Sequence, residues 1–245
     1  MKLKTRIIVD STADLIPEIK ARVSTVPLTV HFGQEEYIDG VTIDNKTFYE
    51  KLVESDVLPT TSQATPDAFM KEYEKWLASP ALSDAERAEL ESIRNDPKEI
   101  ESRFFAPLEF GTAGLRGTMC VGLHQMNIHV IRHATQAFAE VILAEGPEAV
   151  KRGVAVCFDC RNHSQEFARE TAGVMAGNGI PVRIFESLRP TPELSFAVRE
   201  YGCIAGVNVT ASHNPKEYNG YKVYWQDGAQ LPPHHAEAIA KKMEE

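Results

Sequence analysis

Residues 208–225 read NVTASHNPKEYNGYKVYW, a stretch that begins and ends like a buried strand and holds a polar loop between its ends. Asparagine, proline, glycine and serine are turn residues, so a purely geometric role is one interpretation of this loop. Ser212, however, follows a predicted strand directly, at the edge where open α/β sheets place their chemistry. His213 and Lys222 add positive or proton-donating groups near its hydroxyl. The stretch therefore predicts a functional serine.

Strand and helix patterns alternate around this loop. Apolar runs predict strands at GVAVCFD (153–159), PVRIFE (181–186), CIAGVNV (203–209) and YKVYW (221–225). Helical patterns cover about 127–145, 164–179, 191–202, where Thr191 is the expected N-cap, and a last segment from about Pro233. Strands separated by helices of roughly 10–15 residues imply a mostly parallel sheet covered on both faces. We therefore predict an α/β fold with a mixed, mostly parallel sheet.

The chain before this domain divides into two further parts. Residues 1–70 alternate strand patterns, RIIVD (6–10) and VSTVPLTVHF (23–32), with helical ones, LIPEIKAR (15–22) and NKTFYEKLVES (45–55). Residues 71–103 are charged and helical, with a capping box at Ser83–Glu86 and a second cap at Asp96. The predicted organisation is a partial α/β segment at 1–70, a helical connector at 71–103 and a domain at 104–245.

Composition excludes several classes of partner. The 245 residues carry 26 basic and 35 acidic side chains, a net charge of −9, which disfavours a nucleic-acid partner. No apolar run approaches the ~20 residues needed to cross a bilayer, and the amino-terminal apolar run is too short for a signal peptide. The four cysteines suit a reduced compartment better than a disulfide scaffold. We expect a cytoplasmic protein without a membrane partner.

A glycine-rich stretch, GTAGLRG (111–117), supports a phosphate interpretation of the serine loop. It supplies backbone N–H groups free of Cβ bulk together with the guanidinium of Arg116, a combination suited to phosphate oxygens. A Ser-His-Asp hydrolase fits poorly, because Ser212 and His213 are sequence neighbours and no G-x-S-x-G elbow occurs. A serine that carries phosphate fits better, since the added negative charge would be matched by these cations.

Four separated motifs carry a family resemblance: EFGTAGLRG (109–117), RPTPELSFAVRE (189–200), TASHNP (210–215) and NGYKVYWQDGAQ (219–230). In this order they resemble the α-D-phosphohexomutase superfamily, in its phosphoglucomutase/phosphomannomutase branch, from about Tyr73 to Glu245. That family moves phosphate between C1 and C6 of a hexose, through a phosphoserine, Mg²⁺ and an activator of the glucose 1,6-bisphosphate type. The resemblance implies an isomerase that acts on a sugar phosphate.

The resemblance also assigns roles to individual residues. Ser212 would be the phosphoserine and, through its phosphate, a ligand of Mg²⁺, while Arg116 and Lys222 would surround the transferred phosphate. Lys222 would also take part in proton transfer. The remaining roles are in loops: His213 and Asn214 would shape the serine loop, and Gly114 and Gly117 would belong to the phosphate-binding loop.

One family motif is absent from these residues. The family binds Mg²⁺ with an Asp-x-Asp-x-Asp-Arg run, and no such run occurs in the 245 residues. The family's sugar-recognition and terminal phosphate-binding domains also lie beyond the region of resemblance. We therefore expect the chain to hold the phosphate carrier and to be an incomplete enzyme by itself.

The first seventy residues resemble a different family. The runs IIVDSTADL (7–15), VPLTVHFGQEEYIDGVTI (26–43) and LPTTSQATPDAF (58–69) are similar to the amino-terminal part of DegV-type fatty-acid-binding proteins. By that resemblance Thr61 and Ser62 would help to hold a lipid carboxylate. The similarity ends near residues 69–72, inside one predicted helix. Two alternatives to a mutase therefore remain: a fatty-acid-binding module, and a fusion of gene fragments, natural or artefactual, with neither activity.

Two smaller patterns receive structural interpretations. Cys157 and Cys160 match C-x-x-C, but Cys157 lies within a predicted strand, which disfavours redox or zinc chemistry. Asp159 and Arg161 follow the same strand, and we expect them to support the site rather than to catalyse.

Overall fold

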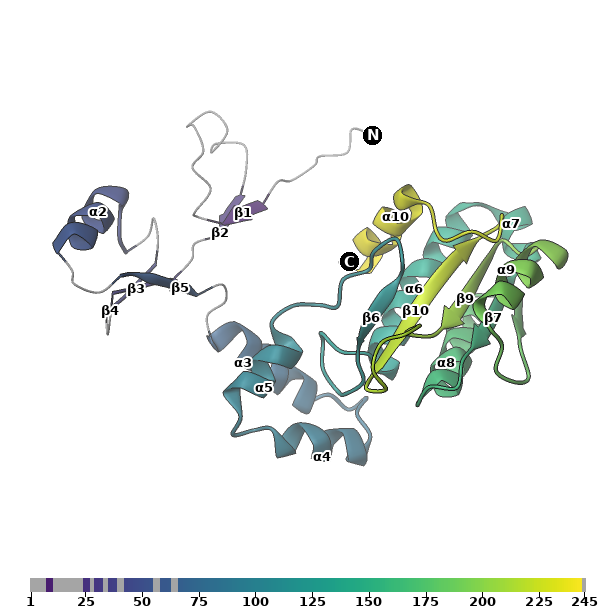
Figure 1. Ribbon diagram of the computed structural model, residues 1–245, viewed down its shortest axis with the longest axis horizontal. Helices are drawn as coiled ribbons and strands as arrows, with labels where there is room; N and C mark the ends of the chain where they lie inside the picture. Colours follow the sequence, from purple (N-terminus) through teal and green to yellow (C-terminus); the bar gives the residue numbers. More distant parts are fainter. Residues whose placement is uncertain are drawn as a thin grey trace. The chain divides into compact units, whose positions relative to one another are not determined.

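The chain forms two compact units, Met1–Lys71 and Glu72–Glu245. Figure 1 shows the computed structural model, which describes residues 8–10, 24–26, 29–32, 35–38, 42–54, 58–62 and 66–243. Within these residues, no helix combines the length and the apolar character that a membrane crossing requires.

The first unit contains two small sheets and a helix. Its elements are β1 Ile8–Asp10, β2 Ser24–Val26, β3 Thr29–Phe32, β4 Glu35–Ile38, α2 Asn45–Glu54 and β5 Thr60–Ser62. β1 and β2 pair in parallel, and β3 pairs antiparallel with both β4 and β5. Val30, Phe32 and Ile43 form a small core against which Phe48 and Leu52 of α2 pack. The strand predicted at 6–10 and the helix α2 are confirmed, whereas the single strand pattern at 23–32 forms two strands, β2 and β3, in different sheets. The helix expected at 15–22 lies outside the described residues.

Three helices precede the sheet of the second unit along the chain. They are α3 Pro66–Leu77, which contains the boundary between the units, α4 Asp84–Ser92 and α5 Pro97–Phe104. Both predicted caps are present: Ser83 and Glu86 form the reciprocal capping box, and the Asp96 side chain accepts from the Glu99 N–H. Tyr73 packs edge-to-face on Phe104, and its hydroxyl donates to a backbone carbonyl of α4.

A five-stranded mixed sheet forms the centre of the second unit, in the order β6-β10-β9-β7-β8. Its strands are β6 Leu115–Thr118, β7 Val154–Phe158, β8 Val182–Ile184, β9 Ala205–Val209 and β10 Tyr218–Trp225. β7 pairs in parallel with β8 and β9, and β10 runs antiparallel to β9 and β6. The α/β prediction is confirmed, with a larger antiparallel share than the expected mostly parallel sheet, because β10 returns directly after the serine loop.

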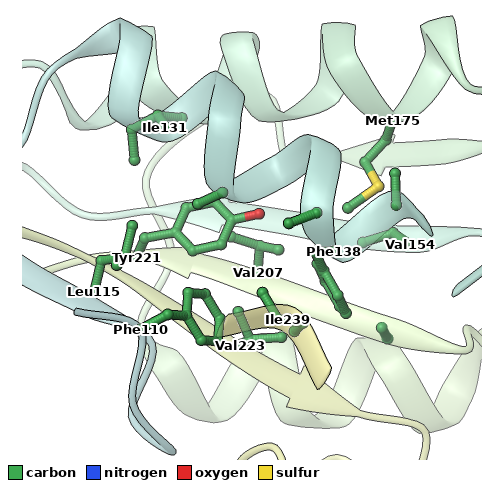
Figure 2. Close-up of a cluster of buried hydrophobic side chains, with 14 of the residues drawn as sticks. Phe110, Leu115, Ile131, Phe138, Val154, Met175, Val207, Tyr221, Val223 and Ile239 are labelled. Carbon is green, nitrogen blue, oxygen red and sulfur yellow. The ribbon is translucent and has the colours of Figure 1, made fainter. Parts of the chain in front are cut away.

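Helices cover the two faces of this sheet unequally. They are α6 Ile128–Ala144, α7 Pro147–Arg152, α8 Ser164–Gly177, α9 Thr191–Glu200 and α10 Pro233–Met243. α6, α8 and α10 enclose the main core on one face, where Ile131 and Phe138 of α6 meet Tyr221 and Val223 of β10 (Figure 2). On the other face α9 packs on β7 and β9. Arg116 and Lys222 lie on that second face, toward the β6 and β10 edge.

One predicted cap is wrong. Thr191 is the first residue of α9 rather than its N-cap, which is Pro190 without a side-chain cap bond. The Thr191 hydroxyl instead accepts from the side-chain amide of the buried Asn208 at 2.6 Å. This contact ties the start of α9 to β9, one strand away from Lys222. The same threonine–proline pattern makes Thr65 the expected N-cap of α3, but Thr65 lies outside the described residues.

Candidate functional site

The serine loop joins the end of β9 to the start of β10 and holds Ser212 in an unusual backbone conformation. Ser212 has φ 56°, a left-handed conformation that costs a residue with a Cβ roughly 1–2 kcal/mol. Among the described non-glycine residues only His163 shares a positive φ. The Ser212 hydroxyl receives a hydrogen bond from Lys222 Nζ at 2.5 Å, and its N–H donates to Thr210 Oγ1 at 3.1 Å. The conformation thus presents an exposed hydroxyl to an ammonium group.

Arg116 approaches the same loop from β6. Its Nη1 donates to Asn214 Oδ1 at 3.0 Å, and in the strand ladder Arg116 lies opposite Gly220. Lys222 follows two residues after Gly220 on the same face of β10. The structure therefore brings together Ser212, Lys222, Arg116 and Asn214, and His213 lies exposed beside Ser212.

The two glycines of the predicted phosphate loop have different surroundings. Gly114 has φ 82°, and a Cβ built on it would lie 1.8 Å from the Tyr221 carbonyl oxygen. This close approach lets the turn before β6 pack directly against β10. Gly117 lies in β6, on the face that contacts the buried side chains of Leu108 and Met126. Both positions have packing functions, and a contact of either glycine with phosphate stays a prediction.

Burial and neighbouring charges change the pKa of Lys222. Partial burial lowers the pKa of its ammonium below the ordinary value, the Arg116 charge lowers it further, and Asp159 opposes the change. Two cations beside one hydroxyl favour an anion there, because bringing a negative group close relieves their mutual repulsion. The surroundings of Ser212 can therefore stabilise a phosphate and also favour a lysine that gives up its proton.

We expect Arg116→Ala to raise the pKa of Lys222, because the repulsion between the two cations disappears while the burial remains. The shift can be followed by NMR of the lysine ε-methylene during a pH titration. Asn214→Ala is the matched control, since it removes the same hydrogen bond but keeps the guanidinium charge. An equal shift in the two variants would contradict the electrostatic explanation.

Several residues of the site are not evident from the sequence. Thr210 links the loop to β7, because its hydroxyl donates to Asp159 Oδ2 at 2.5 Å and accepts the Ser212 N–H. The fully buried Asn219 donates to Asn162 O at 2.9 Å and to Ser164 Oγ at 3.0 Å, which joins β10 to the start of α8. Both belong to the motifs quoted above, but the composition of the loop gives no sign of these partners.

Metal-binding side chains are not clustered in the described residues. These residues contain no group of three His, Cys, Asp or Glu side chains placed to hold a metal ion. Asp159 contacts the loop through Thr210, and its oxygens are engaged by Ser164, Thr210 and Arg161. Cys157 lies buried in β7, where burial raises the pKa of its thiol to about 12.

Comparison with known proteins identifies two matches along the chain. Residues 107–245 match the model of phosphoglucomutase/phosphomannomutase, alpha/beta/alpha domain I, and residues 4–81 match that of an uncharacterised protein family, DegV. Thr61 and Ser62 fall within the second match, in β5, but their side chains lie outside the described part of the structure. Fatty-acid binding at these two residues stays a prediction.

Individual relatives agree with the first match. Phosphopentomutase of Mus musculus is 37% identical over 177 residues, 70% of this chain and 28% of the relative. Glucose 1,6-bisphosphate synthase of the same species is 36% identical over 185 residues, 73% of this chain and 30% of the relative. The chain thus spans less than a third of the length of these curated relatives.

A solved structure supports the same assignment. A crystal structure described as that of a phosphomannomutase from Thermus thermophilus is 34% identical, with a TM-score of 0.51, over 56% of this chain and 30% of that one. The family model alone covers more than half of the residues given. The chain therefore belongs to the phosphoglucomutase/phosphomannomutase family and contains its alpha/beta/alpha domain I.

Proposed function

We propose that Ser212 is a phosphate carrier that exchanges a phosphoryl group with a sugar phosphate. The observation that carries this proposal is the placement of the exposed hydroxyl, held in a left-handed conformation 2.5 Å from Lys222 Nζ. Arg116 adds a second cation beside the loop, which it reaches through Asn214. In phosphoryl transfer most of the catalysis comes from positioning and from charge neutralisation, and both are present around this hydroxyl.

The proposed transfer proceeds between Ser212 Oγ and a bisphosphorylated sugar. The Oγ–phosphorus bond forms as the bond between phosphorus and the sugar oxygen breaks. The serine proton passes to a neutral Lys222, whose lowered pKa favours that form, and the departing sugar oxygen takes up a proton from water. Arg116 and the protonated Lys222 then face the phosphoserine and neutralise part of its charge. The reverse transfer returns the phosphate to a sugar hydroxyl.

The substrate class is a sugar phosphate, by similarity to relatives whose names specify pentose and glucose phosphates. We propose that the substrate is a hexose phosphate of the kind that phosphoglucomutases or phosphomannomutases use, and that glucose 1,6-bisphosphate is the phosphate donor. Bound Mg²⁺ would supply charge neutralisation at the transferred phosphate. The phosphate on Ser212 would be one ligand of the ion. We place this activity in the cytoplasm, in agreement with four free cysteines.

Phosphate mapping tests the proposal directly. The purified full chain is incubated with glucose 1,6-bisphosphate and digested, and the peptide that spans the loop is fragmented. We expect substoichiometric phosphate on Ser212 and none on the neighbouring Thr210, whose hydroxyl is engaged by Asp159. Phosphate on Thr210, or label that persists in Ser212→Ala, would show that the assignment of the carrier is wrong.

A second candidate function rests on the match of residues 4–81 to the DegV family. We propose fatty-acid binding only as an alternative for the first unit. Extraction of the purified chain with organic solvent, followed by mass spectrometry, tests it. A stoichiometric acyl chain would support a lipid-binding module, and its absence together with unlabelled Ser212 would favour a fusion with neither activity.

A further inference from the structure

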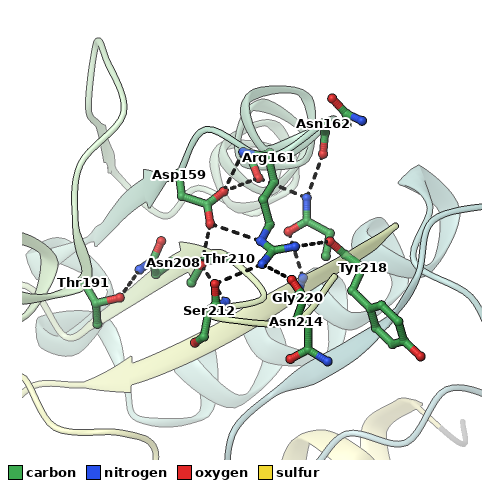
Figure 3. Close-up of polar contacts among 12 residues, drawn as sticks. Asp159, Arg161, Asn162, Thr191, Asn208, Thr210, Ser212, Asn214, Tyr218 and Gly220 are labelled. Atoms are coloured by element: carbon green, nitrogen blue, oxygen red, sulfur yellow. Dashed lines mark hydrogen bonds and ion pairs between the residues drawn. The ribbon is translucent and has the colours of Figure 1, made fainter. Parts of the chain in front are cut away.

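The carbonyl groups of the serine loop converge on one guanidinium group. Arg161 lies in the turn between β7 and α8, and its two terminal nitrogens reach four carbonyl oxygens of the loop (Figure 3). Nη1 donates to Pro215 O at 2.8 Å and to Tyr218 O at 3.0 Å. Nη2 donates to Ser212 O at 2.9 Å and to Asn214 O at 2.6 Å. A single side chain therefore fixes the path of the loop from Ser212 to the first residue of β10.

The carboxylate of Asp159 balances the charge of Arg161. Its Nε lies 3.6 Å from Asp159 Oδ2, and its own N–H donates to Asp159 Oδ1 at 3.0 Å. Asp159 is held in turn by the hydroxyl groups of Ser164 and Thr210. Because only 13% of the Arg161 side chain is exposed and its donors are engaged, the guanidinium is not available to a phosphate. In this respect Arg161 differs from Arg116, which is exposed.

The direction of the carbonyls determines the direction of the amide groups. In a trans peptide the C=O of one residue and the N–H of the next point to opposite sides, and the described residues contain no cis peptide. With the carbonyls of Ser212 and Pro215 drawn to Arg161, the N–H groups of His213 and Lys216 point away from it. Within the described part of the chain, neither N–H donates to a backbone or side-chain acceptor. The outer side of the loop therefore presents free donors.

We propose that Arg161 is a positioning residue that holds Ser212 in its left-handed conformation and turns the amide groups of the loop outward. This inference rests on the proposed function of Ser212 as phosphate carrier. The loop is organised before any phosphate arrives, because all the contacts that shape it lie within the protein. A lysine cannot replace Arg161, since one ammonium group lacks the planar fork that reaches carbonyls on two sides.

Hydrogen exchange of the loop tests the positioning role without any need for activity. Asn214 N–H donates to Ala211 O and Tyr218 N–H donates to Pro215 O, so exchange at these two amides reports opening of the loop. We expect Arg161→Ala to accelerate it by about tenfold or more, and Arg161→Lys to accelerate it nearly as much. Arg132→Ala is the matched control, because Arg132 pairs with Glu170 between α6 and α8 and does not touch the loop. Loop exchange within twofold of wild type in both Arg161 variants would overturn the proposal.

A second readout separates positioning from a merely structural role. The rate of phosphate incorporation at Ser212 should fall at least about tenfold in Arg161→Lys, while the melting temperature of the second unit stays unchanged. In Arg161→Ala, added guanidinium ion should restore part of the rate. An incorporation rate equal to wild type, despite a mobile loop, would also overturn the proposal. If wild type itself takes up no phosphate, the proposed function fails, while the exchange result still decides whether Arg161 orders the loop.

Discussion

Gly114→Ala is expected to destabilise the second unit by about 3 kcal/mol or more, the sum of a left-handed backbone penalty and a severe overlap. Its Cβ would lie 1.8 Å from the Tyr221 carbonyl oxygen, and backbone cannot move aside as a flexible side chain can. Tyr221 is fully buried in the centre of β10, and its neighbour Lys222 faces Ser212. Relief of the overlap would therefore separate the glycine turn from β10 and displace Arg116 from the loop.

Denaturant unfolding followed by tryptophan fluorescence measures this loss. Both tryptophans, Trp76 and Trp225, belong to the second unit, so the signal reports that unit alone. Gly111→Ala is the control within the same turn, because a Cβ at Gly111 meets nothing within 4 Å and its φ is not positive. We expect this control to change stability by less than about 1 kcal/mol. Equal losses in the two variants would mean that close packing against β10 is not the reason for the glycine.

The regular elements of the second unit were predictable because their signals are local. The helix predicted at about 127–145 has an apolar stripe that repeats with the period of a helix, and in the structure Asn127 caps α6 by accepting the Val130 N–H. β7 and β9 are uniformly buried, as continuous apolar runs in the middle of a sheet require. In both cases a window of a few residues contains the whole pattern.

The start of β10 shows where local signals fail. The predicted strand began at Tyr221, because Asn219 and Gly220 resemble turn residues, whereas β10 begins at Tyr218. Asn219 is tolerated inside the strand because Asn162 and Ser164 accept its side-chain hydrogen bonds. Gly220 is required because a Cβ there would lie 2.6 Å from the Thr210 carbonyl oxygen. Both reasons depend on partners distant in the sequence or across the loop.

The candidate site also contains some residues that were predictable from the sequence and others that were not. Motif resemblance placed Ser212, Lys222 and Arg116, and the structure brings these three together. The role of Arg161 was expected only as general support, because its four acceptors lie 51 to 57 residues later in the chain. The Asn208–Thr191 contact was not predicted. Thr191 was expected to be the N-cap of α9 instead, because a threonine before a proline has the usual sequence pattern of a helix N-cap. Contacts between side chains and distant backbone leave no periodic pattern in the sequence.

Among substitutions that keep the Ser212 hydroxyl, Lys222→Met is expected to have the largest effect on phosphoryl transfer, a fall of about 10²–10³-fold in the rate of phosphate incorporation at Ser212. The substitution keeps a long unbranched side chain on β10 but removes the ammonium group that contacts Ser212 Oγ. Arg116 remains, but it reaches the loop through the Asn214 side chain. The phosphoserine would lose its nearest cation and the serine its proton acceptor. The rate is measured with glucose 1,6-bisphosphate by mass spectrometry of the loop peptide.

Two further variants separate charge from proton transfer. Lys151→Met removes the same charge from an exposed position on α7, where Lys151 pairs with Glu148, and should leave the rate unchanged. Lys222→Arg keeps the positive charge but introduces a group that does not release its proton near neutral pH. If Lys222 accepts the serine proton, the arginine variant should be nearly as slow as Lys222→Met. A rate close to wild type in Lys222→Arg would mean that Lys222 contributes its charge alone, and that another group, or water, takes the proton from Ser212.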